Sequence, residues 1–188
     1  VGAMWKIKNE PFLKNVSWID ELNMNLSYGT TGNSGLSEWY ASLGLVGSGP
    51  KYNGNAGWAI SQIPNSDLTW ETVGTLNYRI SGRVFDRVSF GVEFYNKQSK
   101  NLLMEIPYSA TTGHSSGWGN VASMVNRGVD LELNFDFIHS KNVYWGASVN
   151  VNYNNNEITK LYQGLDEISF PDYSLKYQVG YSSSLVYT

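Results

Sequence analysis

Polar and apolar residues alternate along several stretches of the chain, most regularly between residues 143 and 154. Bulky apolar side chains occupy the odd positions and polar or small ones the even positions: Val143, Trp145, Ala147, Val149, Val151 and Tyr153 against Tyr144, Gly146, Ser148, Asn150, Asn152 and Asn154. Because successive side chains of a strand point to opposite sides, this stretch is predicted to be a strand with one apolar and one polar face.

The same alternation recurs along the chain and predicts an all-β antiparallel meander of about six or seven long strands. The first predicted strand ends near Ile7. Further strands are predicted at 22–28, 69–82, 88–106, 129–137 and 143–158, and a last one runs from Tyr177 toward Tyr187. Gly29 to Asn33 is predicted to end the second strand, and a helical turn is predicted near residues 10–16.

The lengths of the strands and of their connections favour a membrane barrel. A strand of a soluble sandwich alternates over about five or six residues, whereas a strand that crosses a bilayer needs about nine to eleven. Outer-membrane barrels have long extracellular loops and short periplasmic turns. We therefore predict outward loops at 33–68, 108–121 and 161–175, and periplasmic turns at 83–87 and 139–142.

Composition agrees with a β protein and leaves the membrane question open. The 188 residues are 41% hydrophobic and 14% aromatic, with 19 glycines. The mean hydropathy is −0.31, and no run approaches the length of about 18 apolar residues that a spanning helix needs. The aromatic residues fit either packing in a β core or girdles at two bilayer interfaces.

Cysteine content and charge exclude several kinds of site. With no cysteine, the chain has no disulfide, no thiolate metal site and no cysteine nucleophile. A net charge of −3 disfavours a nucleic-acid partner. His114 and His139 are too few and too far apart in sequence to predict a zinc site, so we expect two solvated histidines, no metal and no cofactor.

The first residues contain no basic segment followed by an apolar one, as an export signal requires. A protein destined for an outer membrane needs such a signal. We expect that the signal has been removed, or that the chain comes from the interior of a longer protein.

Several segments, in this order, resemble the C-terminal barrel of SusC/RagA-type TonB-dependent transporters. They are Leu26-Ser27-Tyr28-Gly29-Thr30-Thr31-Gly32-Asn33, Asn65-Ser66-Asp67-Leu68-Thr69-Trp70-Glu71, residues 92–103 (VEFYNKQSKNLL) and 125–133 (VNRGVDLEL). Trp5-Lys6-Ile7 and residues 152–161 fit as well, so that the resemblance covers about residues 5–165.

The resemblance implies a large outer-membrane importer of glycans or peptides in a Bacteroidetes-type Gram-negative cell. Such an importer is plugged by an N-terminal domain, powered through TonB and often paired with a SusD-like surface lipoprotein. Residues 1–188 then form a partial barrel without plug, TonB-contacting segment or signal peptide, and we expect no transport from them alone. The remaining barrel, the plug and the membrane lipid are the implied partners.

Acidic residues on the predicted polar faces are the first candidate site. Glu93, Asp130, Glu132 and Asp136 share these faces. Paired carboxylates serve acid–base catalysis in some enzymes, but regular spacing along a strand is typical of the wet wall of a lumen, and nothing places a nucleophile beside them. We predict that they face the lumen, where they either tune permeation or pair with Arg79 and Arg127, and we do not expect an enzyme.

Aromatic residues in the predicted outward loops are the second candidate site. Flat rings there can stack on sugars or hold a partner, or they can pack against their own loops. These residues are Trp39, Tyr40, Tyr52, Trp58 and Trp118. Trp70 and Trp145 lie near predicted strand ends and are interpreted as anchors at the membrane interface.

Two other classes of function remain as alternatives to a barrel wall. One is a soluble β-sandwich that binds carbohydrate through loop tryptophans and tyrosines. The other is a small hydrolase, which would need turnover that depends on Asp130 or Glu132. A protein that stays soluble and monodisperse without detergent would contradict the membrane interpretation.

Overall fold

The computed structural model describes residues 1–35, 40–114, 116–170 and 175–184. Within these ranges the regular secondary structure is almost entirely strand. The strands are β1 (Gly2–Lys6), β2 (Ile19–Asn33), β3 (Leu45–Tyr52), β4 (Asn55–Gln62), β5 (Glu71–Val84), β6 (Val88–Pro107), β7 (Ser116–His139), β8 (Tyr144–Lys160), β9 (Glu167–Phe170) and β10 (Leu175–Gln178). Short 3-10 turns occupy Ile7–Asn9, Ala110–Thr112 and Tyr162–Gly164.

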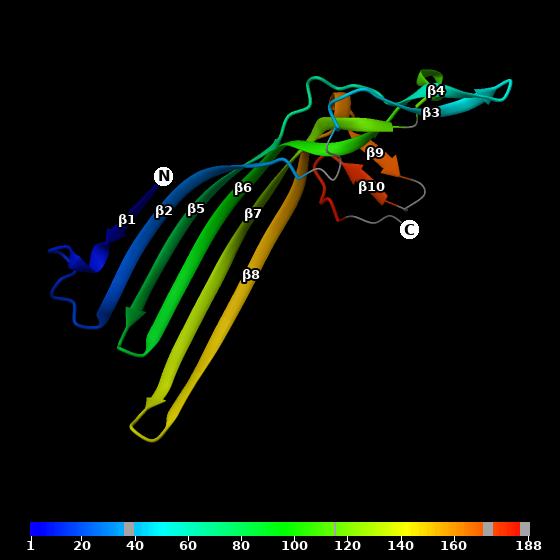
Figure 1. Ribbon diagram of the computed structural model, residues 1–188. Helices are drawn as coiled ribbons and strands as arrows, with labels where there is room; N and C mark the ends of the chain where they lie inside the picture. Colours follow the sequence, from blue (N-terminus) through cyan, green and yellow to red (C-terminus); the bar gives the residue numbers. More distant parts are fainter. Residues whose placement is uncertain (36–39, 115, 171–174, 185–188) are drawn as a thin grey trace. The chain divides into compact units, whose positions relative to one another are not determined.

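Six strands form one sheet in the order β1-β2-β5-β6-β7-β8, and Figure 1 shows β5 to β8 running side by side. Neighbours in the sheet follow one another in the chain, apart from the β3–β4 excursion between β2 and β5. The predicted all-β meander of long strands is therefore confirmed. The two remaining sheets are hairpins, β3 with β4 and β9 with β10.

Both short connections are tight turns, as the sequence predicts. Between β5 and β6, Phe85 and Asp86 adopt left-handed φ values of 56° and 54°, which suits the twist of a two-residue hairpin. Between β7 and β8, the Ser140 N–H donates to the Val143 carbonyl at 2.9 Å.

The chain divides into two units, which are described separately. The first contains residues 1–30, 74–98 and 125–157, and the second contains residues 31–73, 99–124 and 158–188. The described helical turns are all far shorter than a helix that crosses a bilayer.

Several details of the predicted strand pattern are wrong. The segment from Gly29 to Asn33 continues β2 instead of ending it. The predicted loop at 33–68 contains the β3–β4 hairpin, and the predicted loop at 161–175 contains β9. β7 begins at Ser116, inside the predicted loop at 108–121. The last predicted strand, from Tyr177 toward Tyr187, is not found: β10 ends at Gln178 and pairs with β9, and residues 179–184 are turns and coil. Its predicted end at Tyr187 lies outside the described residues.

The second unit contains a small apolar core. Ala122, Ile158 and Leu161 are buried, and Leu102, Met104, Ile168, Tyr177 and Val179 pack against them. Backbone hydrogen bonds hold the segment after β10 to β8, because Gly180 donates to the Ile158 carbonyl at 2.8 Å and Ile158 donates to the Tyr181 carbonyl at 2.9 Å. The β9–β10 hairpin is thus fixed to the strands beside it.

The described side chains of the first unit form no comparable core, and one face of its sheet is apolar and exposed. Phe135 and Phe137 stack at 5.9 Å between ring centroids, and Trp145 lies 4.8 Å from Phe137. Large apolar side chains on this face remain exposed, including Leu76, Phe94, Phe137, Trp145, Val149, Val151 and Tyr153. A soluble sandwich covers such a face with a second sheet, which the described part of the chain does not supply.

Candidate functional site

Arg79 on β5 joins acidic side chains of two further strands on the polar face of the first unit. Its Nη1 lies 3.3 Å from Glu93 Oε2 on β6, and its Nη2 lies 3.1 Å from Glu132 Oε2 on β7. The other Glu132 oxygen accepts from Asn134 Nδ2 at 3.2 Å. One guanidinium therefore compensates two carboxylates that would otherwise repel each other.

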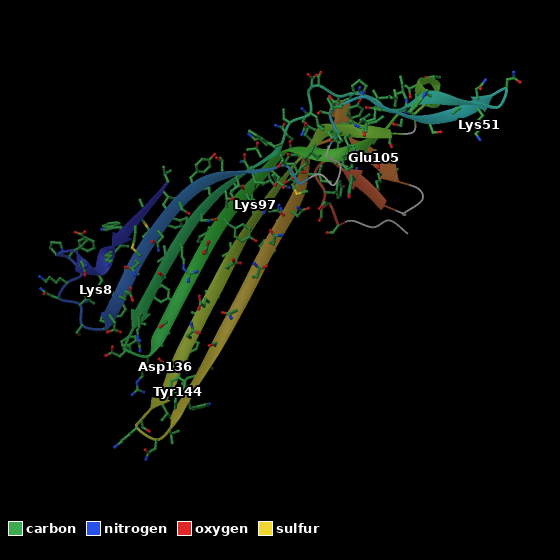
Figure 2. The ribbon with its side chains drawn as sticks, in the orientation of Figure 1. Lys8, Lys51, Lys97, Glu105, Asp136 and Tyr144 are labelled. Carbon is green, nitrogen blue, oxygen red and sulfur yellow. The ribbon has the colours of Figure 1, made fainter. Side chains whose placement is uncertain are left out.

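A second ion pair lies nearer the β7–β8 turn. Arg83 Nη2 is 3.5 Å from Asp136 Oδ2, while Tyr144 donates its hydroxyl to Asp136 Oδ1 at 2.5 Å. Figure 2 shows Asp136 and Tyr144 close together near this turn. The tyrosine, the first residue of β8, thus lies on the polar face, as the alternation predicts.

Amide side chains continue the polar face along β7 and β8. Cross-strand hydrogen bonds join Asn152 to Asp130, Ser148 to Asn134 at 2.7 Å, and Asn156 to Asn126 at 2.7 Å. These pairs leave a shallow hollow of about 440 Å³, and its polar lining is Arg79, Asp130, Glu132, Asn150 and Asn152. The surface can bind water and polar solutes by hydrogen bonds.

Two glycines let long side chains cross a whole strand on this face. Arg79 passes over Gly91 of β6, where an added Cβ would lie 2.6 Å from Nη2. Tyr95 of β6 passes over Gly128 of β7, where an added Cβ would lie 2.3 Å from the phenol, and its hydroxyl donates to Asn154 of β8 at 3.1 Å. Each glycine lets one strand be tied to the strand two places away.

The four predicted acidic residues of this face are therefore found together on one hydrogen-bonded surface. Their ion pairs differ from the prediction. The arginines that pair with these carboxylates are Arg79 and Arg83, and Arg127 takes no part in the ion pairs among the described residues. The alternation alone could have indicated Arg83, which occupies the same face as Arg79. No group of three or more metal-ligating side chains occurs among the described residues.

Three of the five aromatic residues of the second candidate site have described side chains. Tyr40 and Trp58 are exposed, whereas Trp118 on β7 is half-buried. Trp39 and the side chain of Tyr52 lie outside the described residues, as does the side chain of His139, and His114 is half-buried. The predicted anchors Trp70 and Trp145 are 67% and 59% exposed.

Asn120 organises the second unit, a role that the sequence did not reveal. Its Oδ1 accepts from the Thr69 N–H at 2.7 Å, and its Nδ2 donates to the carbonyls of Thr69 and Asn101 at 2.7 and 2.8 Å. Asn101 lies within β6 and adopts a left-handed φ of 56°. One amide thus satisfies backbone groups from two segments distant in sequence.

Hydrogen bonds from the segment Asn65 to Glu71 hold the connection before β5 in place. Asn65 Nδ2 donates to the Trp118 carbonyl at 2.9 Å. Glu71 accepts the Leu103 N–H at 3.0 Å and Asn33 Nδ2 at 2.9 Å. The segment therefore fastens the long connection before β5 to β2, β6 and β7.

Comparison with known proteins identifies the family. The TonB dependent receptor-like, beta-barrel family matches residues 1–185. The chain belongs to this family. TonB-dependent receptors are outer-membrane β-barrel transporters, a non-enzymatic kind of protein, so the family favours the barrel wall over the soluble sandwich.

Individual TonB-dependent receptors are similar to this chain in sequence and in structure. TonB-dependent receptor P39 of Formosa agariphila is 34% identical over 158 residues, and SusC of Bacteroides thetaiotaomicron is 31% identical over 170. The structure of the RagAB peptide importer in the closed-closed state superposes with a TM-score of 0.86 at 35% identity, over 96% of this chain. The predicted SusC/RagA resemblance is confirmed.

The chain corresponds to a small part of each relative. The match covers 84% of this chain but 15% of P39, and 86% of this chain but 17% of SusC. For the RagAB structure the match covers 20% of the chain concerned. The described sheet is thus one sector of a barrel of this family.

Replacing Asn120 by alanine in the full-length protein is expected to loosen the connection before β5. The change leaves backbone groups of Thr69 and Asn101 without their partner, at a cost of about 1–3 kcal/mol. Hydrogen exchange at Thr69 should accelerate, while exchange in β8 stays unchanged. Asn142→Ala, in the exposed β7–β8 turn, is the control, and equal exchange in both variants would contradict the role of Asn120.

Proposed function

We propose that residues 1–188 form a wall sector of a TonB-dependent outer-membrane importer, and that they have no transport activity by themselves. The parent protein, meaning the full-length protein to which this sector belongs, would supply the remaining barrel, the plug and the segment that contacts TonB. Peptides are the first substrate class to test, because the RagAB relatives at 35% identity are described as peptide importers; glycans are the second.

The observation that supports this proposal is the two-sided sheet of the first unit. Its apolar face is exposed over four neighbouring strands, and its other face carries paired charges and amides. Lipid on one side and a wet lumen on the other satisfy both faces at once. We therefore propose that Glu93, Asp130, Glu132 and Asp136 face the lumen, and that Trp70 and Trp145 lie at the membrane interfaces.

The same proposal assigns each connection between strands to one side of the membrane. The connections at 34–70, 108–115 and beyond Lys160 would face the cell exterior, and the turns at 85–87 and 140–143 the periplasm. A SusD-like surface lipoprotein would then meet the barrel on its exterior side. Because the relatives named in the comparisons come from Formosa and Bacteroides, a Bacteroidetes-type outer membrane is the proposed location.

Cysteine labelling tests the assignment of the two faces. Asn150 and Val149 are adjacent, exposed residues of β8 on opposite faces. In the parent protein in its native membrane, Asn150→Cys should react with a water-soluble maleimide, while Val149→Cys should not, because lipid covers it. Reaction of Val149→Cys with Asn150→Cys protected would overturn the proposed orientation.

Import itself is tested by deleting the gene of the parent protein. Uptake of a labelled peptide mixture should fall and should return when the parent protein is restored. Uptake that does not change for peptides or for glycans would contradict the proposed importer. The matched control restores the parent protein in a strain that lacks TonB, and it separates TonB-energised uptake from passive leakage.

A further inference from the structure

Arg127 belongs to the apolar face of β7 and not to the polar face that holds the ion pairs. Both of its neighbours in the chain point to the polar face, because Asn126 accepts a hydrogen bond from Asn156 at 2.7 Å and Gly128 lies under the ring of Tyr95. Successive side chains of a strand point to opposite sides. The side chain of Arg127 is therefore directed to the apolar face of the first unit, where it is exposed.

The apolar rows of three neighbouring strands end at one level, beside Arg127. Cross-strand contacts of residue 126 with 156, 130 with 152, and 95 with 128 place Arg127 opposite Asn155 on β8 and Asn96 on β6. The last apolar residues of the three rows are Phe94, Val129 and Tyr153, and the next residues on the same face are Asn96, Arg127 and Asn155. A border between apolar and polar side chains therefore crosses β6, β7 and β8 at the level of Arg127.

The height of the apolar band below this border matches that of an outer-membrane barrel. Phe137, whose ring lies 4.8 Å from that of Trp145, is ten residues from Arg127 along β7, which is about 34 Å at about 3.4 Å per residue. Barrel strands tilt by about 35–45°, so this length spans about 24–28 Å of the membrane, and the apolar band of such barrels is about 25 Å tall. Trp145 and Arg127 therefore mark its two edges.

The side chains at the border have the chemistry that binds a phosphate group. Arg127, Asn155 and Gln98 are exposed on the same face. A guanidinium donates two parallel hydrogen bonds to one phosphate, and neutral amides add N–H donors. The apolar surface of Val129 and Tyr153 begins directly beside Arg127 and can be covered by acyl chains. A phosphate joined to acyl chains fits both surfaces, whereas a water-soluble anion fits only the polar one.

We propose that Arg127, with Asn155 and Gln98, binds the phosphate of a lipid head group in the outer leaflet of the membrane. The proposal rests on the proposed function, which places lipid against the apolar face and this border at the exterior interface. An arginine on the lipid side costs much at the midplane of a barrel but little at its interfaces. Arg127 is thus a lipid contact on the outside of the barrel and not a charge of the lumen.

Photo-cross-linking of lipid to the purified parent protein tests this site. The probes are phosphatidate and diacylglycerol with the same photoactivatable acyl chain, and the measured quantity is the ratio of their cross-linking yields on residues 128–157. The unaltered protein should favour phosphatidate. Arg127→Gln should lower the ratio by about fivefold, as expected for one cation near an anionic lipid surface. Arg127→Lys should lower it less, because lysine keeps the charge but loses the planar fork.

Lys97→Gln is the matched control, because it removes the same charge from the other face. Lys97 follows Tyr95 by two residues and therefore shares the polar face. Figure 2 shows Lys97 toward the end of the strands away from Asp136 and Tyr144. The ratio should change less than about twofold in this variant, and equal losses for Arg127→Gln and Lys97→Gln would overturn the inference.

A nearby carboxylate gives a test of opposite sign. Glu157 lies on the same face as Arg127, one diagonal step away, and makes no ion pair with it among the described contacts. Diagonal neighbours of this kind have Cβ atoms about 7–8 Å apart, so the carboxylate repels a phosphate held by Arg127. Glu157→Gln should therefore raise the phosphatidate ratio, and a fall would contradict the assigned position of the phosphate.

The remaining outcomes separate lipid from a free anion, and this inference from the proposed function. Inorganic phosphate should not lower the ratio beyond the effect of chloride at equal ionic strength, and a specific loss would identify a site for soluble phosphate and overturn the inference. If Val149→Cys is protected from maleimide but the unaltered protein shows no preference for phosphatidate, the lipid site fails and the importer stands. If Val149→Cys reacts freely, the apolar face does not meet lipid and the proposed function fails.

Discussion

Leu133→Arg in the parent protein is expected to prevent most of the protein from assembling in the outer membrane. Leu133 shares the apolar face of β7 with Phe135 and Phe137, whose rings stack. An arginine on the lipid side of a barrel costs about 2–4 kcal/mol near the bilayer midplane. The measurement is the fraction of parent protein in the membrane that migrates as a folded barrel on unboiled gels.

The adjacent residue provides the control. Asn134 lies on the polar face, where its Oδ1 accepts from Ser148 Oγ at 2.7 Å. Asn134→Arg therefore loses local hydrogen bonds but keeps its charge in water, and it should assemble nearly as well as the unaltered protein. Equal losses at positions 133 and 134 would contradict the separation of the two faces.

Gly128→Ala is expected to have the second largest effect. A Cβ there would lie 2.3 Å from the Tyr95 ring and hydroxyl, and 2.4 Å from the backbone carbonyl oxygen of Tyr153. The tyrosine can rotate away, but the carbonyl can move only with β8. We expect a loss of about 1–3 kcal/mol, as for overpacking in other proteins, observed as a lower temperature at which the folded barrel band disappears.

Alanine substitutions at two other glycines provide the comparison for this effect. A Cβ at Gly29 meets nothing within 4 Å, so Gly29→Ala should leave the transition temperature unchanged. A Cβ at Gly91 meets the mobile end of Arg79 at 2.6 Å, so Gly91→Ala should displace the guanidinium from Glu132 and cost less than Gly128→Ala. The reverse order for positions 91 and 128 would show that side-chain crowding, and not the β8 backbone, governs the loss.

The long strands could be predicted because alternation acts residue by residue. Burial of one face and hydration of the other select side chains at every second position, so 143–154 reveals both the strand and its faces. The polar assignment of Tyr144 followed from the same rule, and its hydrogen bond to Asp136 agrees with it.

The short strands and the pairings could not be predicted in the same way. Glycine and serine dilute the alternation in β3 and β4, although Asn53-Gly54 is a recognised hairpin signal that could have revealed them. Gly29 and Gly32 resemble a strand end because glycine weakens an isolated strand, yet neighbouring strands hold β2 in place. The reach of Arg79 to Glu132 depends on the register of three strands, which local sequence does not encode.

The amide side chains of the polar face have a consequence for any cargo that moves along it. Asparagine keeps the same neutral form at every physiological pH, and a single hydrogen bond exchanged with water changes the free energy by only about 0.5–1.5 kcal/mol. A solute passing Asn150 and its neighbours would trade one weak contact for another of equal strength. The amide part of this face would therefore let polar molecules move along it without tight binding, while the charged side chains of Arg79, Arg83 and their partners would still distinguish solutes by charge.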